Sequence, residues 1–226
     1  KLDPVSRERL LHGNWEYDSG EDRLFDYESV LNMFTNSSVS ESEGERYLSC
    51  DIALLGSDKL VICVWYGMVV KEIVTKDKTS ADNVEKLIRN LADIHKIPQK
   101  NIIIDSDGVG QYLSHYMKGV QPFVNNAKPL SKESYQNLKT QCYYKLAEQI
   151  NVGNIWVKCN DIDLRNKIIE ELEVIRRKNM DNDSKLAILS KKEMKAVLGH
   201  SPDFADALMM RMRYLFKGGN RILGWR

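Results

Sequence analysis

The sequence contains no apolar run that approaches the roughly 18 consecutive residues of a membrane-spanning helix. Its first residues also lack the apolar core of a signal peptide. No GxxxxGK[ST] loop occurs, so the chain does not itself carry a P-loop ATPase. These absences predict a cytoplasmic protein that has no membrane partner and no nucleotide-hydrolysing motor of its own.

Cysteine is scarce and widely spaced. Cys50, Cys63, Cys142 and Cys159 form no CxxC pair, which argues against a zinc site or a disulfide framework and favours buried thiols in a reducing compartment. A strong net charge is also missing, because the chain carries a formal charge of +1 at pH 7. Any binding of nucleic acid would therefore depend on local positive charge.

The sequence does contain enough apolar residues, 42% of 226, to bury the core of one globular domain. Residues 1–45 differ from the rest, because they mix charges with isolated aromatic residues and end in a polar, turn-rich segment at 36–45. We expect this part to be a linker or leader. The domain proper is expected to span residues 46–226.

Apolar periodicity and turn residues predict the elements of this domain. Three antiparallel strands are expected first, and helices then alternate with short strands, which is the order of elements in an α/β sheet. The expected strands cover residues 47–55, 60–66, 68–75, 101–104, 120–124, 155–158 and 185–189, and the expected helices cover residues 80–94, 111–117, 132–150, 162–177 and 201–216. The predicted fold class is α/β, with a mixed sheet (an antiparallel meander plus parallel strands) flanked by helices.

Four aspartates stand where such a sheet places its chemistry. Asp51 interrupts the first strand, where an ionised carboxylate is costly to bury unless it is paired. Asp105 closes the apolar run Ile-Ile-Ile, at the carboxyl end of a buried strand. Asp203 and Asp206 lie three residues apart in the first turn of the last helix, so they share one face of that helix.

Carboxylate oxygens are the ligands that hard cations such as Mg²⁺ and Mn²⁺ prefer. Two such ions about 3.5–4 Å apart can activate water and neutralise the charged transition state of phosphodiester cleavage. The four aspartates are therefore candidate metal ligands and catalytic residues. Plainer explanations exist for three of them: Asp203 as a charge at a helix N-terminus, Asp206 as an exposed carboxylate, and Asp105 as a turn residue. Asp51 is the hardest to explain in that way.

Four blocks of sequence carry a resemblance to a known family. They are Tyr-Leu-Ser-Cys-Asp-Ile-Ala at 47–53, Ile-Ile-Ile-Asp-Ser-Asp-Gly-Val-Gly at 102–110, Tyr-Gln-Asn-Leu-Lys-Thr-Gln-Cys-Tyr-Tyr-Lys-Leu-Ala-Glu at 135–148, and His-Ser-Pro-Asp-Phe-Ala-Asp-Ala-Leu at 200–208. In order and spacing they resemble the nuclease domain of phage terminase large subunits. The last block is the most telling, because this family often ends its nuclease domain with a helix start of the form D-x-x-D-A.

The resemblance implies an RNase H-like fold and an endonuclease that cleaves double-stranded concatemeric viral DNA during genome packaging. Cleavage would be independent of sequence and would use two divalent cations, Mg²⁺ or Mn²⁺. By the same resemblance, Asp51 and Asp105 are metal ligands. Asp203 is the first choice for the third ligand, Asp206 joins or replaces it, and Asp107 is a candidate outer ligand.

The family also implies a larger protein around this domain. Residues 1–45 would follow an upstream P-loop ATPase domain, with the Leu-Leu-His-Gly-Asn-Trp segment at 10–15 resembling the end of that domain. The implied partners are double-stranded DNA, the small terminase subunit and the portal or procapsid, in the cytoplasm of a bacterial host.

Contacts with DNA should be basic and directed at phosphates, which position a protein without reading sequence. A solvated surface charge is the alternative for each basic candidate, and a structural role at a loop–helix junction is the alternative for the histidine. The candidates are Lys128, Lys132, Lys139, Arg176, Arg177, Lys191, Lys192 and His200.

Three other functions compete with this interpretation. A Holliday-junction resolvase or transposase-type nuclease shares the acidic cluster. A phosphotransferase of the actin and sugar-kinase type shares the strands and a glycine-bearing turn, but pairs two such domains in a much longer chain. A non-catalytic DNA-binding module would have lost the acidic residues, and here all four are present.

Overall fold

The computed structural model describes residues 22–41, 45–52, 59–77, 80–107, 113, 116–178 and 184–216. Six strands form one central sheet: β1 (Arg46–Asp51), β2 (Leu60–Tyr66), β3 (Val69–Lys76), β4 (Ile102–Asp105), β5 (Gln121–Phe123) and β6 (Trp156–Val157). Their order across the sheet is β5-β4-β1-β2-β3-β6. Strand β2 pairs antiparallel with β1 and β3, and parallel pairs join β1 to β4, β4 to β5, and β3 to β6. The predicted mixed sheet is confirmed.

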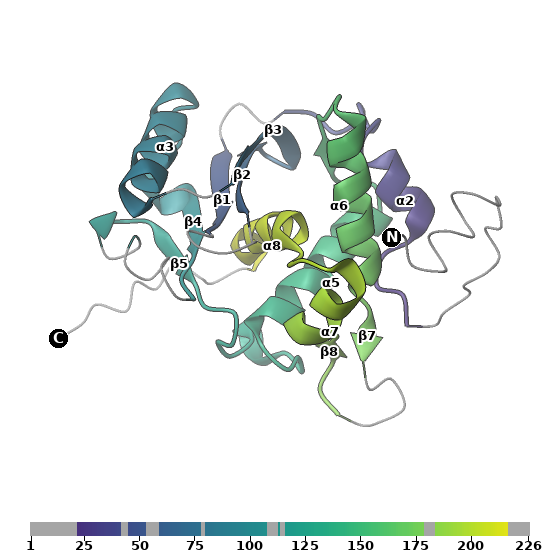
Figure 1. Ribbon diagram of the computed structural model, residues 1–226. Helices are drawn as coiled ribbons and strands as arrows, with labels where there is room; N and C mark the ends of the chain where they lie inside the picture. Colours follow the sequence, from purple (N-terminus) through teal and green to yellow (C-terminus); the bar gives the residue numbers. More distant parts are fainter. Residues whose placement is uncertain are drawn as a thin grey trace.

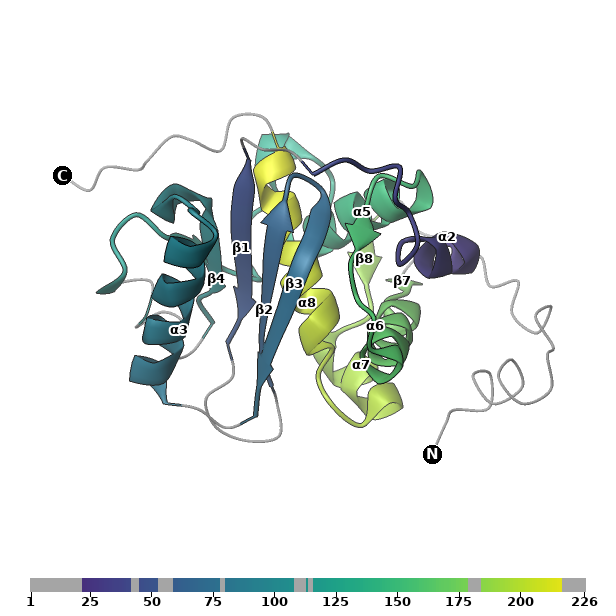
Figure 2. The ribbon, with the colours of Figure 1, turned by 90° about the horizontal axis from the view of Figure 1, so that it is seen from above.

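Helices cover both faces of this sheet (Figure 1). The helices of the described residues are α2 (Tyr27–Asn32), α3 (Ala81–Ile94), α5 (Leu138–Asn151), α6 (Ile162–Val174), α7 (Lys191–Leu198) and α8 (Asp203–Met210), with short 3-10 segments η1 (Gln99–Asn101), η2 (Leu130–Lys132) and η3 (Arg211–Leu215). Helix α3 lies on one face, and α8 lies on the other with α5 and α6 beyond it (Figure 2). None of the helices in the described ranges is long and apolar enough to span a membrane.

Strand alternation divides the core between the two faces of the sheet. In β1, Leu48 and Cys50 pack on the α3 side, together with Ile102 and Ile104 of β4. Ile103 packs on the opposite side, in the cluster that contains the residues of α5, α6 and α8. Because successive side chains of a strand point to opposite faces, these contacts determine to which face each remaining residue of β1 and β4 points.

The structure corrects the limits of two predicted helices. The helix expected at 132–150 begins only at Leu138, because the side chain of Asn137 accepts a hydrogen bond from the backbone N–H of Thr140 (2.8 Å) and caps the helix there. The helix expected at 162–177 ends at Val174. The chain then becomes extended, and β7 (Arg177–Lys178) pairs with β8 (Ala187–Ile188).

Helix α7 was missed in the sequence, although it carries a capping box: Ser190 accepts from the backbone of Glu193, whose side chain accepts from the backbone of Ser190. Gly199 then ends the helix with a left-handed backbone (φ +80°). Conversely, the helix expected at 111–117 and the end of the strand expected at 47–55 lie largely outside the described residues.

Part of the expected leader belongs to the core. Helix α2 packs on α5 and α6, and the buried residues of this segment are Leu24, Phe25, Val30, Met33 and Phe34. Val30 lies within α2, and Met33 and Phe34 follow directly after its last residue. The folded unit therefore includes residues that the sequence analysis assigned to the leader.

Candidate metal centre

Asp51 and Asp105 lie side by side at the carboxyl ends of neighbouring parallel strands. In the register of β1 and β4, Cys50 is opposite Ile104, so the next residue of each strand is an aspartate. Cys50 and Ile104 both point to the α3 side. Strand alternation therefore turns both aspartates to the other face, toward α8.

The N-terminal turn of α8 supplies the other two carboxylates. All eight residues of this helix are buried, and Asp203 and Asp206 are only 5% and 4% exposed. The helix packs against β1 and β2 on one side and against α5 and α6 on the other. This position between sheet and helices places the two aspartates beside the carboxyl ends of β1 and β4.

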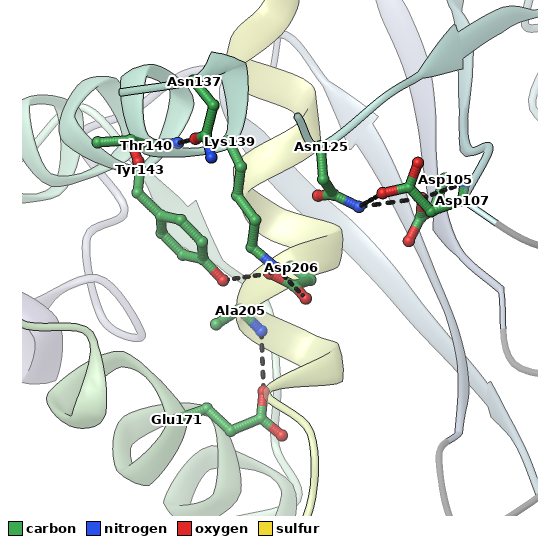
Figure 3. A network of polar contacts seen from close by, with 10 residues as sticks. All are labelled: Asp105, Asp107, Asn125, Asn137, Lys139, Thr140, Tyr143, Glu171, Ala205 and Asp206. Atoms are coloured by element: carbon green, nitrogen blue, oxygen red, sulfur yellow. Dashed lines mark hydrogen bonds and ion pairs between the residues drawn. The ribbon is translucent and has the colours of Figure 1, made fainter. Parts of the chain in front are cut away.

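Helix α5 provides two donors to Asp206 (Figure 3). The ammonium of Lys139 lies 2.7 Å from Oδ1 and 2.8 Å from Oδ2 of Asp206, and the hydroxyl of Tyr143 donates to Oδ1 at 2.5 Å. The two donors lie four residues apart and therefore point from the same face of α5. Lys139 is only 13% exposed, so the ion pair is largely withdrawn from solvent.

Asp105 and Asp203 accept hydrogen bonds from other parts of the chain. Oδ1 of Asp105 accepts from the backbone N–H of Asp107 (2.9 Å) and from Nδ2 of Asn125 (3.3 Å), which also donates to Asp107 (2.7 Å; Figure 3). Oδ2 of Asp203 accepts from the backbone N–H of Lys59 (2.8 Å). The carboxylates are thus held in place by protein donors on the sheet side.

A fifth acidic residue, Glu171 of α6, borders this group. Its side chain is 1% exposed, and Oε2 accepts from the backbone N–H of Ala205 in α8 (2.9 Å; Figure 3). Nδ1 of His200 lies 3.8 Å from Oε1 but hydrogen-bonds to the carbonyl of Ser201 (2.7 Å). Glu171 was not predicted as a site residue, because in the sequence it is one charged residue among several on a helix.

Burial and the charges of neighbouring carboxylates raise pKa values within this group. Burial raises the pKa of Asp51 well above its usual range, and the charges of Asp206, Asp105 and Asp203, in that order, raise it further. Burial also raises the pKa of Asp105. For Glu171, burial is the main cause of a pKa raised to about 9, and Asp203 and Asp206 add to it. Such a group is stabilised by an added cation.

The donor set fits a hard divalent cation, which prefers carboxylate oxygens. In the part of the chain that the structure describes, however, no three Asp, Glu, His or Cys side chains already surround a common point as metal ligands do. Lys139 pairs with the carboxylate of Asp206, and Asn125 donates to that of Asp105. The residue types therefore fit a divalent cation, and these two contacts occupy oxygens of two of the carboxylates.

The other predicted site residues lie at different distances from this centre. Asp107 shares Asn125 with Asp105, next to the group. Among the basic candidates, Lys139 lies inside the centre and Lys191 is close enough to lower the pKa of Asp51. Arg176 pairs with Asp22 (3.1 Å), away from the carboxylates. The remaining basic candidates are solvent-exposed: Lys128, Lys132, Arg177 and Lys192.

The mixed six-stranded sheet with helices on both faces is an RNase H-like fold. In comparisons with known proteins, neither a protein-family model nor a curated protein matches the sequence. Solved structures do match. The nuclease domain of the large terminase subunit gp2 of bacterial virus Sf6 superposes with a TM-score of 0.72 at 22% identity, covering 84% of this chain and 98% of that one.

Two nucleases from thermophilic phages show the same likeness at lower identity. The large terminase nuclease of phage G20c, solved with bound magnesium, has a TM-score of 0.54 at 14% identity, covering 86% of this chain and 98% of that one. The large terminase nuclease domain of Thermus phage P74-26 has a TM-score of 0.50 at 12% identity, covering 84% and 93%. The chain therefore has the fold of the nuclease domains of phage large terminase subunits.

Proposed function

We propose that this domain is a metal-dependent endonuclease that cleaves double-stranded concatemeric viral DNA during genome packaging, without sequence specificity. The observation that carries the proposal is the gathering of buried and partly buried carboxylates from two parallel strands and one helix at the same edge of the sheet. The shared fold with terminase nuclease domains, one of them solved with magnesium, supports it.

Asp51, Asp105 and Asp206 are the best candidates for the metal ligands. Among the neighbouring aspartates, Asp206 has the largest effect on the pKa of Asp51, and it also acts on that of Asp105. Asp203 acts less strongly on Asp51 and accepts from the backbone of Lys59. On this ground we propose Asp206 before Asp203 as the third ligand, whereas the sequence analysis put Asp203 first and let Asp206 join or replace it.

When bound, two Mg²⁺ or Mn²⁺ ions would supply an activated water and positive charge for the pentacovalent transition state. Residues of the chain would place and orient the carboxylates. Asp51 and Asp105 present their carboxylates from the rigid sheet. Lys139 is the counter-ion of Asp206, and Tyr143 keeps the Asp206 carboxylate oriented.

DNA would approach the edge of the sheet that carries the aspartates. Lys191, which acts on Asp51 from α7, and the exposed Lys128, Lys132 and Lys192 are candidates for phosphate contacts. We propose further that the chain before Leu24 connects the domain to an upstream P-loop ATPase, and that the full protein works with a small terminase subunit and a portal or procapsid in the host cytoplasm.

The proposal is tested with supercoiled plasmid incubated with the protein in Mn²⁺, in Mg²⁺ and in EDTA. Asp51→Asn and Asp105→Asn are compared with Asp93→Asn, which changes an exposed aspartate of α3. Nicking and linearisation that require metal and are lost only in the first two variants support the nuclease. The absence of cleavage by folded protein in either metal would contradict it, and a strong preference for four-way junctions over plain duplex would indicate a resolvase instead.

A further inference from the structure

Helix α8 has no N-cap of its own. Its N-cap position is occupied by Pro202, which makes no side-chain cap hydrogen bond. The backbone N–H groups at the second and third positions of a helix normally receive such a bond, from Ser, Thr, Asp or Asn at the N-cap. In a helix buried over its whole length, leaving these groups without an acceptor would be costly.

Glu171 supplies the missing acceptor from another helix. Its carboxyl group accepts from the backbone N–H of Ala205 (2.9 Å). Ala205 is the third residue of α8, one of the two positions that an N-cap side chain would satisfy. The acceptor that caps α8 therefore comes from a residue 34 positions away from Ala205 in the sequence.

Stability alone does not explain a carboxyl group at this position. Glu171 is 1% exposed and close to the charges of Asp203 and Asp206, so an acidic side chain is disfavoured there. The capped turn, however, is the one that carries both aspartates, at its first and fourth residues. Any rotation or fraying of this turn would displace both carboxylates relative to Asp51 and Asp105.

We propose that Glu171 is a positioning residue of the metal centre: its acceptor oxygens fix the first turn of α8 and thereby the placement of Asp203 and Asp206. The inference rests on the proposed function for its catalytic consequence, but the capping itself can be measured without metal. Lys139 and Tyr143 orient the carboxylate of Asp206, whereas Glu171 holds the backbone that carries it.

The experiment compares Glu171→Met, which keeps the size but removes the acceptor, with Glu171→Gln, which keeps one acceptor oxygen. Glu170→Met, one residue earlier on α6 and partly exposed, is the matched control. Three quantities are measured: amide hydrogen exchange of Phe204 and Ala205 in EDTA, the rise in Tm on adding Mn²⁺, and plasmid nicking. In Glu171→Met we expect exchange about fivefold faster, as for loss of a cap, a smaller Mn²⁺-induced rise in Tm, and nicking at least about tenfold slower.

Glu171→Gln and Glu170→Met are expected to match the wild type in all three measurements. The proposal is overturned if Glu171→Met leaves exchange unchanged, or if exchange rises while the response to Mn²⁺ stays at the wild-type level. It is also overturned if Glu171→Gln keeps protected amides yet loses the Mn²⁺ response, a result that stays decisive even if Glu171→Met does not fold. Failure of the wild type to nick DNA would count against the proposed function, and the exchange measurement would still test the cap.

Discussion

Lys139 and Asp206 form a largely buried ion pair, with the ammonium 2.7 Å from one carboxylate oxygen and 2.8 Å from the other. The pair lies beside Asp51 and Asp105, and the charge of Asp206 raises the pKa of both of these carboxyl groups. Lys139 therefore provides, from the protein itself, part of the positive charge that this group requires. It follows that Lys139 and a divalent cation should compete for Asp206.

Removing Lys139 should make the protein more dependent on metal. For Lys139→Met we expect a loss of about 3 kcal/mol in the free energy of unfolding in EDTA, because a buried carboxylate loses its partner. Mn²⁺ should restore part of this loss, so its stabilising effect should exceed that in the wild type. Urea unfolding in EDTA and in Mn²⁺ measures both the loss in the free energy of unfolding and its recovery by the metal. Lys145→Met, which removes a pair with Glu148 nearer the surface of the same helix, should cost less than about 1 kcal/mol.

Divalent cations should stabilise the wild-type protein even without DNA. At a concentration about 100 times its Kd, Mn²⁺ should add about 2.7 kcal/mol, which corresponds to a rise in Tm of about 5–10 °C for a domain of this size. Differential scanning calorimetry with Mn²⁺, Mg²⁺ and EDTA checks this. An unchanged Tm at millimolar Mn²⁺ would argue against a metal site.

Asp51→Asn should separate stability from activity. The variant replaces a carboxyl group whose ionised form is disfavoured by burial and by three neighbouring aspartates, so we expect a higher Tm in EDTA than in the wild type. Nicking should fall by more than about 100-fold, since loss of a ligand should exceed the 10- to 100-fold cost of losing a group behind a ligand. Calorimetry and plasmid cleavage, with Asp93→Asn in parallel, measure the two effects. A variant that is both less stable and fully active would show that Asp51 has a different role.

The stability of the metal-free protein should fall as the pH rises. The pKa of Glu171 is raised to about 9 in the folded chain, against about 4.3 when unfolded. A raised pKa means that the folded state binds the proton more tightly, so this contribution is complete below about pH 4 and is lost between about pH 4 and 9. Tm recorded in EDTA across this range should decrease, and Glu171→Gln should flatten the decrease. If Tm fell in parallel with pH in the wild type and in Glu171→Gln, Glu171 would not be the cause of the decrease.

The sequence predicted those parts of the site that depend on local rules. Strand alternation places Asp51 and Asp105 on one face once β1 and β4 are neighbours, and both strands follow from their apolar and β-branched residues. The start of α8 at Asp203 was also predictable, from Pro202 and the apolar run that follows. For these elements the local pattern and the fold agree.

Contacts between distant segments were not predictable from one sequence. Which of Asp203 and Asp206 faces Asp51 depends on how α8 rotates between the sheet and α5. The cap from Glu171 and the hydrogen bonds from Asn125 likewise exist only after the chain has folded. By contrast, α7 had a local signal in Ser190 and Glu193 that the sequence analysis overlooked.

Helix α2 has a practical consequence for shortened versions of the protein. A chain cut at residue 45 would look reasonable from the sequence, yet it would remove Leu24, Phe25, Val30, Met33 and Phe34 from the core. The apolar surfaces of α5 and α6 that α2 covers would then face water, and uncovered patches of this kind promote aggregation. Any minimal fragment meant to stay soluble should therefore begin upstream of Leu24.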